Sequence, residues 1–487
     1  MYLGIDLGTS GVKLLLVDEA QRVVGSAAAP LTVQRPQTGW AEQDPDDWLH
    51  ATTLAMNDLR SRAPSAVSAV RGIGLSGQMH GATLLDANDT VLRPAILWND
   101  TRSHAEAATL DATPAFRAIS GNIVFPGFTA PKLAWVQKHE PAVFAKLAKV
   151  LLPKDYLRLW LTGEYASEMS DASGTSWLDV AARAWSPELL EATGLTPAQM
   201  PRLVEGSHAS GQLRSELASA WGMGRVVVAG GAGDNAATAI GLGTTTQGTA
   251  FVSLGTSGVL FAATPAYQPK ADSAVHTFCH AVPETWHQMG VALSATDSLN
   301  WWGKVCEMAP SALTQELGAT FAPQQPLTFL PYLSGERTPH NDPRVRGSFV
   351  GLDHTHGRTQ MTQAVLEGVA YASRDSLEAL TSTGTGIDRV MAVGGGTASP
   401  LWLQILANAL GIPVDLPADG DFGAAFGAAR LGRLAETGER VAAVCTPPAV
   451  ARSFEPDPAH HAYFAQGYAT FRALYPALTR AMAASAT

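Results

Sequence analysis

Two identical six-residue segments carry residue types that bind phosphate groups. The sequence Leu-Gly-Thr-Ser-Gly-Val stands at residues 7–12 and again at residues 254–259, about half the chain apart. Glycine lets a ligand approach the backbone closely, successive N–H groups in such a turn form a concave anion site, and the hydroxyls add donors. One copy alone is usually a plain surface hairpin, but the repetition favours two loops that clamp a polyphosphate. The residues expected to do so are Gly8, Thr9, Ser10, Gly255, Thr256 and Ser257.

An acidic residue precedes only the first of these loops. Asp6 stands two residues before Gly8, whereas the second copy has Ser253 at the same place. A carboxylate beside a phosphate loop is a suitable ligand for Mg²⁺, which binds few side chains and retains much of its water. We therefore expect Asp6 to hold Mg²⁺, with a turn-capping acid as the alternative.

A second carboxylate follows a glycine-rich turn. Apolar residues 226–229 predict a strand, 230–233 predict a turn, and a helix is expected from Asp234 onward. Asp234 could cap this helix, accept a proton from a substrate hydroxyl, or do both. The segment also fits a loosened dinucleotide fingerprint, which requires an acid about 20 residues later. No Asp or Glu stands between Asn235 and Ala271, so the nicotinamide alternative fails.

Three other segments carry weaker signals. Gly394–Gly396 lie between a predicted strand at 389–393 and a helix that begins at Ser399-Pro400 and ends before Gly411, so they form either an adenosine site or an ordinary turn. Polar side chains at 77–81 and 98–102 suit a small polar ligand. His276, Cys279 and His280 resemble zinc ligands by type, but no fourth partner has a convincing spacing.

The elements that must position these residues alternate between strands and helices. Strands are expected at 2–7 and 12–17 around the first loop, and Asp44-Pro45 opens a helix with the order of an N-cap and first turn. Such alternation predicts a layered α/β architecture. The repeat predicts two like domains, which we place at residues 1–245 and 246–487.

Composition excludes several classes of protein. Of the 487 residues, 46% are hydrophobic, which is enough for a sizeable core. The net charge of −10 argues against a nucleic-acid partner or a basic membrane anchor. Apolar runs are too short for a membrane-spanning helix. The 3 cysteines have no CxxC spacing and fit a reducing compartment, so we expect a cytoplasmic protein.

The chain resembles a known family, the FGGY carbohydrate kinases, from its first residue to about residue 435. Gly127-x-Thr129-x-x-Lys132-Leu133-x-Trp135 is similar to the first family signature, and residues 347–367 are similar to the second. SGQMHGATLLD, GFTAPKL, GDNAA and YLSGERTPH resemble the branch that phosphorylates D-xylulose. Glycerol kinases have Arg-Glu where this chain has Met79-His80, which disfavours glycerol.

The resemblance implies two ribonuclease-H-like domains of the actin and hexokinase superfamily around a deep hinged cleft. It implies ATP-dependent phosphorylation of D-xylulose with Mg²⁺, in an enzyme of a family that often forms homodimers. Two alternatives stay open: a kinase for another ketose or polyol, and a sugar or ATP sensor without transfer activity. The residues that the resemblance assigns are Asp234 as general base, Asp6 near the metal and the transferred phosphoryl group, Met79, His80 and Asn235 as sugar contacts, Thr256 in the second phosphate loop, and Gly395 and Gly396 at the adenosine.

Overall fold

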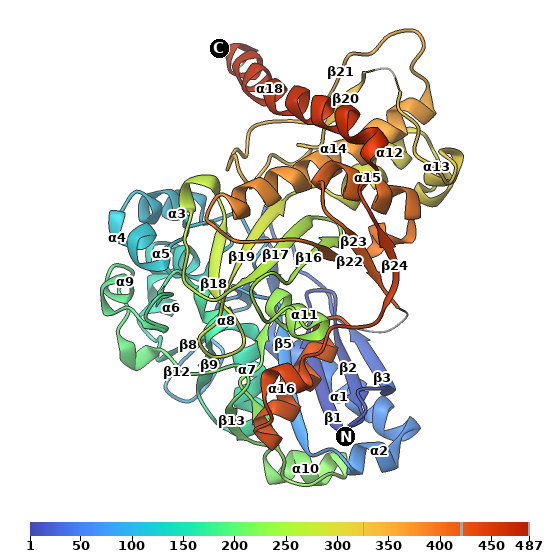
Figure 1. Ribbon diagram of the computed structural model, residues 1–487. Coiled ribbons are helices and arrows are strands. Elements are labelled where there is room, and N and C mark those ends of the chain that lie inside the picture. Colours follow the sequence, from blue (N-terminus) through green and yellow to red (C-terminus); the bar gives the residue numbers. More distant parts are fainter. Residues whose placement is uncertain (325, 419–421, 486–487) are drawn as a thin grey trace.

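The computed structural model describes residues 1–324, 326–418 and 422–485. Two α/β domains are each built on a seven-stranded sheet (Figure 1). In the first sheet the order is β13-β14-β5-β1-β2-β3, and β15 pairs with β5. Its strands are β1 (Tyr2–Leu7), β2 (Gly11–Val17), β3 (Val23–Pro30), β5 (Gly72–Gly77), β13 (Ala209–Gln212), β14 (Val227–Ala229) and β15 (Ala232–Gly233).

The second sheet has the order β18-β19-β17-β16-β22-β23-β24. In both sheets an antiparallel hairpin stands beside a parallel neighbour, because β1 pairs with β2 and β5, and β16 pairs with β17 and β22. The repeated hexapeptides are thus equivalent hairpins, which confirms the predicted fold class. The strands are β16 (Ala250–Leu254), β17 (Gly258–Thr264), β18 (His276–Cys279), β19 (Trp286–Ala292), β22 (Val390–Val393), β23 (Val414–Pro417) and β24 (Val450–Phe454).

The helix α16 (Ala424–Thr437) comes late in the chain but packs on the first sheet, where it lies against β5 and β1 (Figure 1). Glycine permits this contact. A Cβ built on Gly74 of β5 would lie 1.7 Å from the carbonyl oxygen of Ala428. The backbone of α16 therefore touches the sheet directly. The division into 1–245 and 246–487 stays a prediction.

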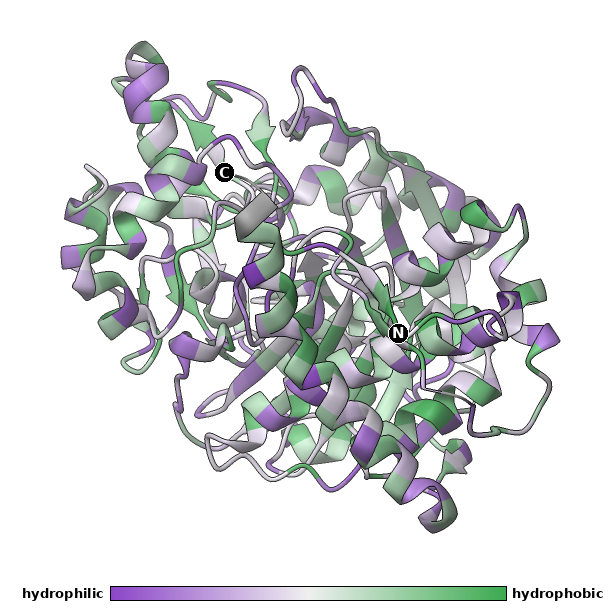
Figure 2. Ribbon diagram, turned by 90° about the horizontal axis from the view of Figure 1, so that it is seen from above, coloured by the Kyte–Doolittle hydropathy of each residue, from purple (hydrophilic) through white to green (hydrophobic). Residues whose placement is uncertain are grey.

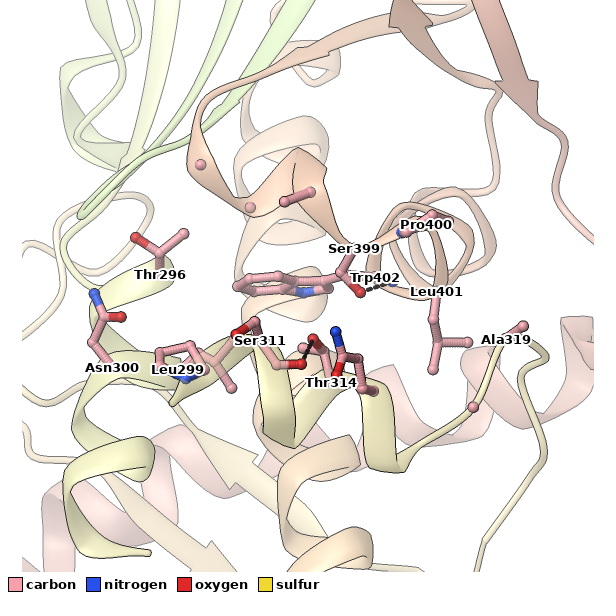
Figure 3. Close-up of a pocket in the computed structure, with 16 residues that line it drawn as sticks. Thr296, Leu299, Asn300, Ser311, Thr314, Ala319, Ser399, Pro400, Leu401 and Trp402 are labelled. Carbon is pink, nitrogen blue, oxygen red and sulfur yellow. Dashed lines mark hydrogen bonds between the residues drawn. The ribbon is translucent and has the colours of Figure 1, made fainter. Parts of the chain in front are cut away.

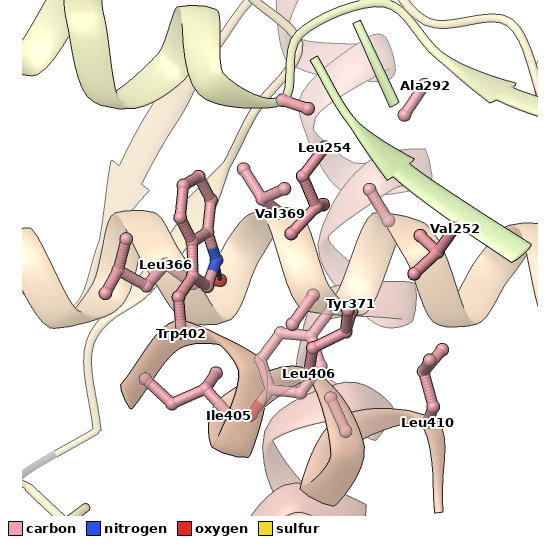
Figure 4. Close-up of a cluster of buried hydrophobic side chains, with 14 of the residues drawn as sticks. Val252, Leu254, Ala292, Leu366, Val369, Tyr371, Trp402, Ile405, Leu406 and Leu410 are labelled. Atoms are coloured by element: carbon pink, nitrogen blue, oxygen red, sulfur yellow. Dashed lines mark hydrogen bonds between the residues drawn. The ribbon is translucent and has the colours of Figure 1, made fainter. Parts of the chain in front are cut away.

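The core of the second domain lies between its sheet and α14 (Arg358–Thr381) and α15 (Pro400–Leu410). Trp402 is 1% exposed and packs among Leu254, Leu366 and Val369 (Figure 4). Its Nε1 donates a hydrogen bond to the Leu366 carbonyl oxygen at 3.1 Å. Helix α15 has the predicted ends, with Ser399 as N-cap and Gly411 in the left-handed conformation as C-cap.

Helices between β5 and β13 form the side of the first domain that meets the second. In Figure 2 hydrophobic residues line the strands and inner helix faces of both domains. The Asn122 side chain pairs with the backbone N–H and carbonyl of Thr277 on β18 at 2.9 Å each. The helices of this region are α3 (His104–Asp111), α4 (Pro114–Ser120), α5 (Thr129–His139), α6 (Pro141–Phe144), α7 (Pro153–Thr162), α8 (Met169–Ser173) and α9 (Pro187–Glu191).

The remaining elements flank these layers. The predicted helix at Asp44-Pro45 is α1, which begins at Pro45 with Asp44 as its N-cap. Within the described residues, none of the helices is long and apolar enough to cross a membrane. The other helices are α1 (Pro45–Arg62), α2 (Pro64–Ser68), α10 (Ser215–Trp221), α11 (Asp234–Leu242), α12 (Thr296–Val305), α13 (Pro310–Glu316), α17 (Val441–Val444) and α18 (His461–Ser485), and the short strands are β4 (Glu42–Gln43), β6 (Thr83–Leu85), β7 (Ala95–Ile96), β8 (Lys149–Leu151), β9 (Ala166–Glu168), β10 (Leu178–Asp179), β11 (Ala184–Trp185), β12 (Arg202–Val204), β20 (Thr328–Leu330) and β21 (Ser348–Val350).

Candidate active site

The two Gly-Thr-Ser loops connect the strands of the two central hairpins. The second loop is held through its carbonyl groups at the start of α12. The Gly255 carbonyl oxygen accepts from the N–H of Thr296 at 2.9 Å, and the Thr256 carbonyl oxygen accepts from the N–H of Ala295 at 2.8 Å. Ser10 and Thr256 are exposed at the loop tips, where a ligand can reach them.

Asp234 is the first residue of α11. Gly233, which has no side chain, is the N-cap, so the prediction that Asp234 caps the helix is wrong. Instead, its Oδ1 accepts hydrogen bonds from the backbone N–H of Asn235 at 2.7 Å and from Asn235 Nδ2 at 3.0 Å. Burial raises the pKa of Asp234 to about 6, and the neighbouring Asp6 carboxylate also raises it. The structure thus brings Asp6 close enough to Asp234 for the two charges to interact.

This pair of carboxylates has the composition of a magnesium site. Mg²⁺ is usually held by one or two carboxylates together with substrate phosphates and water. Among the described residues there is no group of three or more acidic, His or Cys side chains that could hold a metal alone. The residues present therefore fit a metal that arrives with a phosphate ligand.

His80 has an unusual backbone conformation, with φ at 69°. Its Nδ1 lies 2.7 Å from the Gly174 carbonyl oxygen, and its ring stacks on Phe128 at 4.6 Å between centroids. A carbonyl can only accept, so Nδ1 carries the proton and Nε2 is an acceptor. Burial, together with the nearby charge of Lys132, lowers the pKa of His80 to about 3. His80 is neutral at physiological pH.

Lys132 of the first family signature supports the segment that carries His80. This lysine is fully buried, and its Nζ donates to the carbonyl oxygens of His80 at 2.8 Å and Gly127 at 2.7 Å. Met79 is also buried, and its Sδ lies 2.8 Å from the position of a Cβ built on Gly233. The predicted sugar contacts Met79 and His80 therefore lie beside the turn that leads to Asp234.

A hydrogen-bonded chain joins this segment to the first phosphate loop. The Thr9 hydroxyl donates to Gln78 Oε1 at 3.0 Å and accepts from Trp98 Nε1 at 2.9 Å. Its single proton is thus already donated within the protein. Trp98 is 48% exposed, whereas Arg102 is buried, pairs with Asp100 at 2.6 Å and lies over the Trp40 ring. Within the polar stretch at 98–102, Trp98 therefore lies at the site, whereas Arg102 is used in internal packing.

A pocket of about 820 Å³ lies in the second domain (Figure 3). Gly395 and Gly396 form part of its wall, and the side chain of Trp402 lies beside them; the role of the two glycines at an adenosine stays a prediction. A Cβ built on Gly395 would meet no atom within 4 Å. The sequence analysis did not predict the residues of the opposite wall, because α12 and α13 contain no recognisable ligand-binding motif. It consists of Thr296, Leu299, Asn300, Pro310, Ser311, Thr314 and Gln315.

The histidines near Cys279 are part of the aromatic packing of the second sheet. Both ring nitrogens of His280 are used, since Nε2 donates to the Thr244 carbonyl oxygen at 2.9 Å and Nδ1 accepts from the N–H of Ala281 at 2.8 Å. This leaves His280 without a lone pair for a metal. His276 packs against Phe125, and burial lowers its pKa well below the usual range.

Two like α/β domains, paired Gly-Thr-Ser loops, a half-buried pair of acids and a nucleotide-sized pocket together define a two-domain sugar kinase. Comparison with known proteins identifies the group. Residues 1–241 match the N-terminal domain of the FGGY family of carbohydrate kinases, and residues 250–436 match its C-terminal domain. The chain belongs to this family.

Similar proteins carry one recurrent name. The chain is 49% identical over 486 residues to a xylulose kinase of Escherichia coli strain K12, with 99% of this chain and 100% of the relative covered. A solved structure of a xylulose kinase from Brucella ovis is 62% identical, with a TM-score of 0.97 over 98% of this chain and 99% of that one. A xylulose kinase structure from Rhodospirillum rubrum is 31% identical, with a TM-score of 0.92 over 99% of both chains.

Proposed function

We propose that this kinase transfers the γ-phosphoryl group of ATP to the 5-hydroxyl of D-xylulose. The observation that carries the proposal is the half-buried Asp234 carboxylate, with its pKa raised to about 6, next to the segment of the neutral His80. A base of this pKa is mostly ionised at pH 7 and is matched to proton acceptance near that pH. The names of similar proteins supply the identity of the sugar.

In this mechanism Asp234 accepts the proton of the attacking hydroxyl. His80 offers Nε2 to another sugar hydroxyl, Asn235 binds beside the base, and Met79 packs against the carbon chain. Transfer proceeds through a loose transition state, so alignment of the hydroxyl with the phosphorus contributes more than strong base catalysis. Mg²⁺, held by Asp6 and the phosphates, would supply positive charge against the transferring group.

In the proposed complex the nucleotide binds with its adenosine in the pocket of the second domain and its phosphates near the two Gly-Thr-Ser loops. Adenosine lies along the bare backbone of Gly395 and Gly396, and its phosphates extend toward the two loops. Backbone N–H groups of the loops stabilise the phosphates. The loop residues assigned to this role are Gly8, Thr9, Ser10, Gly255, Thr256 and Ser257. A homodimer, frequent in the family, stays a prediction that sedimentation analysis would check.

A coupled assay of ADP release with MgATP tests the function. D-xylulose should give strong turnover, while D-ribulose, glycerol, gluconate and a reaction without sugar should give little. Turnover with a different sugar alone would replace D-xylulose by another ketose or polyol. Folded protein that binds ATP but never releases ADP would instead support a sensor.

A further inference from the structure

A buried ionic cluster lies behind the turn that carries Asp234. It consists of Lys154 and Arg158 of α7, Asp155 beside them, Glu168 at the end of β9 and Asp171 of α8, and every side chain in it is 0% exposed. The Lys154 ammonium lies 2.8 Å from Asp155, 3.4 Å from Asp171 and 3.6 Å from Glu168. The proposed mechanism uses none of these five groups.

Residues 230–233, predicted as a turn, end in the short strand β15, and both ends of this segment are bonded to the cluster or to its direct partner. At the start of the turn, Arg158 Nη2 donates to the Gly230 carbonyl oxygen. At its end, the N–H of Gly233 donates to Ser170 Oγ at 3.1 Å. Ser170 Oγ in turn donates to the Glu168 carboxylate, with 2.9 Å to Oε2. The residue after Gly233 is Asp234, so these bonds fix the point at which the proposed base leaves the turn.

Helix α8, which contains Ser170, also contacts the segment that carries His80. Glu168 holds the start of α8 by accepting from the N–H groups of Ser170 at 2.7 Å and Asp171 at 2.9 Å. Directly after α8, the Gly174 carbonyl oxygen accepts the hydrogen bond from His80 Nδ1 at 2.7 Å. The distance between the proposed base and the proposed sugar contact therefore depends on where α8 sits.

We propose that Ser170, together with Arg158, is a positioning residue that aligns Asp234 with the reacting hydroxyl. The proposal rests on the proposed function, because it assumes that Asp234 is the base. Removing the Ser170 hydroxyl leaves the Gly233 N–H without its acceptor, and the turn then relaxes. A displacement of about 1 Å at a reacting group can cost about 100-fold in rate.

The test compares Ser170→Ala with Ser120→Ala. Ser120 is a similarly buried serine whose Oγ lies within donating distance of the Phe116 and Asn122 carbonyl oxygens and accepts from the Asn122 N–H, so its side-chain hydrogen bonds stay within residues 116–122. Both variants should lose thermal stability to a similar extent. We expect Ser170→Ala to lose about 10- to 100-fold in kcat, with KM for sugar and ATP changed by less than about twofold.

Three results decide the matter. If Ser170→Ala and Ser120→Ala have the same kcat, Ser170 is only structural and the proposal is overturned. If Ser170→Ala does not fold, Ser170→Cys keeps the side-chain shape with a slightly larger atom that is a weaker acceptor, and a wild-type kcat in that variant would overturn the proposal as well. Asp234→Asn is measured in parallel: if it turns over normally, the proposed base itself fails, whereas an inactive Asp234→Asn with a normal Ser170→Ala refutes only the positioning role.

Discussion

Replacement of Asp234 by Asn should make the protein more stable while it removes activity. The amide has the shape of the carboxylate, and its oxygen can still accept the two hydrogen bonds from Asn235. The charge is lost, and with it the burial penalty and the repulsion from Asp6. Turnover should fall by about 10²- to 10⁴-fold, the usual contribution of a general base.

The size of the stability gain follows from the pKa of Asp234. A rise from 3.8 to about 6 makes ionisation about 3 kcal/mol more costly in the folded than in the unfolded chain. Because the side chain is not fully buried, we expect a gain of about 1–3 kcal/mol for the variant. The penalty is complete above pH 6, about half as large near pH 5, and absent below about pH 4, where both states bind the proton.

Urea unfolding of both proteins at pH 7.5 and pH 5 measures this difference. The stability advantage of Asp234→Asn should shrink by about half at the lower pH. Asp388→Asn, which removes an exposed loop carboxylate, serves as the control and should change little at either pH. If wild type and Asp234→Asn have the same free energy of unfolding at pH 7.5, the charged Asp234 carboxylate does not destabilise the folded protein, and the reasoning is refuted.

Three further predictions follow from the geometry of the site and its supports. Because His80 stays neutral with a pKa of about 3, sugar binding to Asp234→Asn, which lacks the carboxylate that titrates near pH 6, should have a constant Kd between pH 6 and 8; weaker binding below pH 6.5 in calorimetric titrations would contradict the neutral ring. Gly395→Val should raise KM for ATP about tenfold, which is about 1.4 kcal/mol, and leave the melting temperature unchanged, since the new side chain extends into open space. Gly74→Ala should lose about 3 kcal/mol or more of unfolding free energy in urea titrations because its Cβ meets the Ala428 carbonyl, whereas Gly386→Ala, with no atom nearby, should lose little.

Local sequence signals predicted the elements that depend on local chemistry. The paired hairpins, the N-caps at Asp44 and Ser399 and the C-cap at Gly411 all appear where turn and cap residues placed them. These features need only neighbours in the sequence, so a pattern can reveal them. The prediction that Asp234 could be the N-cap of α11 was wrong, because Gly233, with its extended backbone, is the N-cap.

Features that depend on distant contacts left no pattern in the sequence. Ser170 reaches Gly233 over 63 positions of the chain, and the Asn122 amide pairs with Thr277 over 155. The second wall of the pocket beside Gly395 and Gly396 comes from α12 and α13, whose residues have ordinary helical spacing. Thr9 matched a phosphate motif, yet its hydroxyl is bonded to Gln78, which only the folded structure reveals.

The contact of α16 with the first sheet determines when that sheet can be completed during synthesis. β1 and β5 are made early, but the helix that covers them lies at residues 424–437. At about 5–20 residues per second, the ribosome needs roughly 10–40 s to reach the end of α16 after Asp234 has been added. During this interval the glycine-lined face of the sheet stays uncovered. A nascent chain paused before α16 should therefore be sensitive to protease and bind chaperones. Once α16 has emerged from the ribosome, it should protect the first domain from the protease.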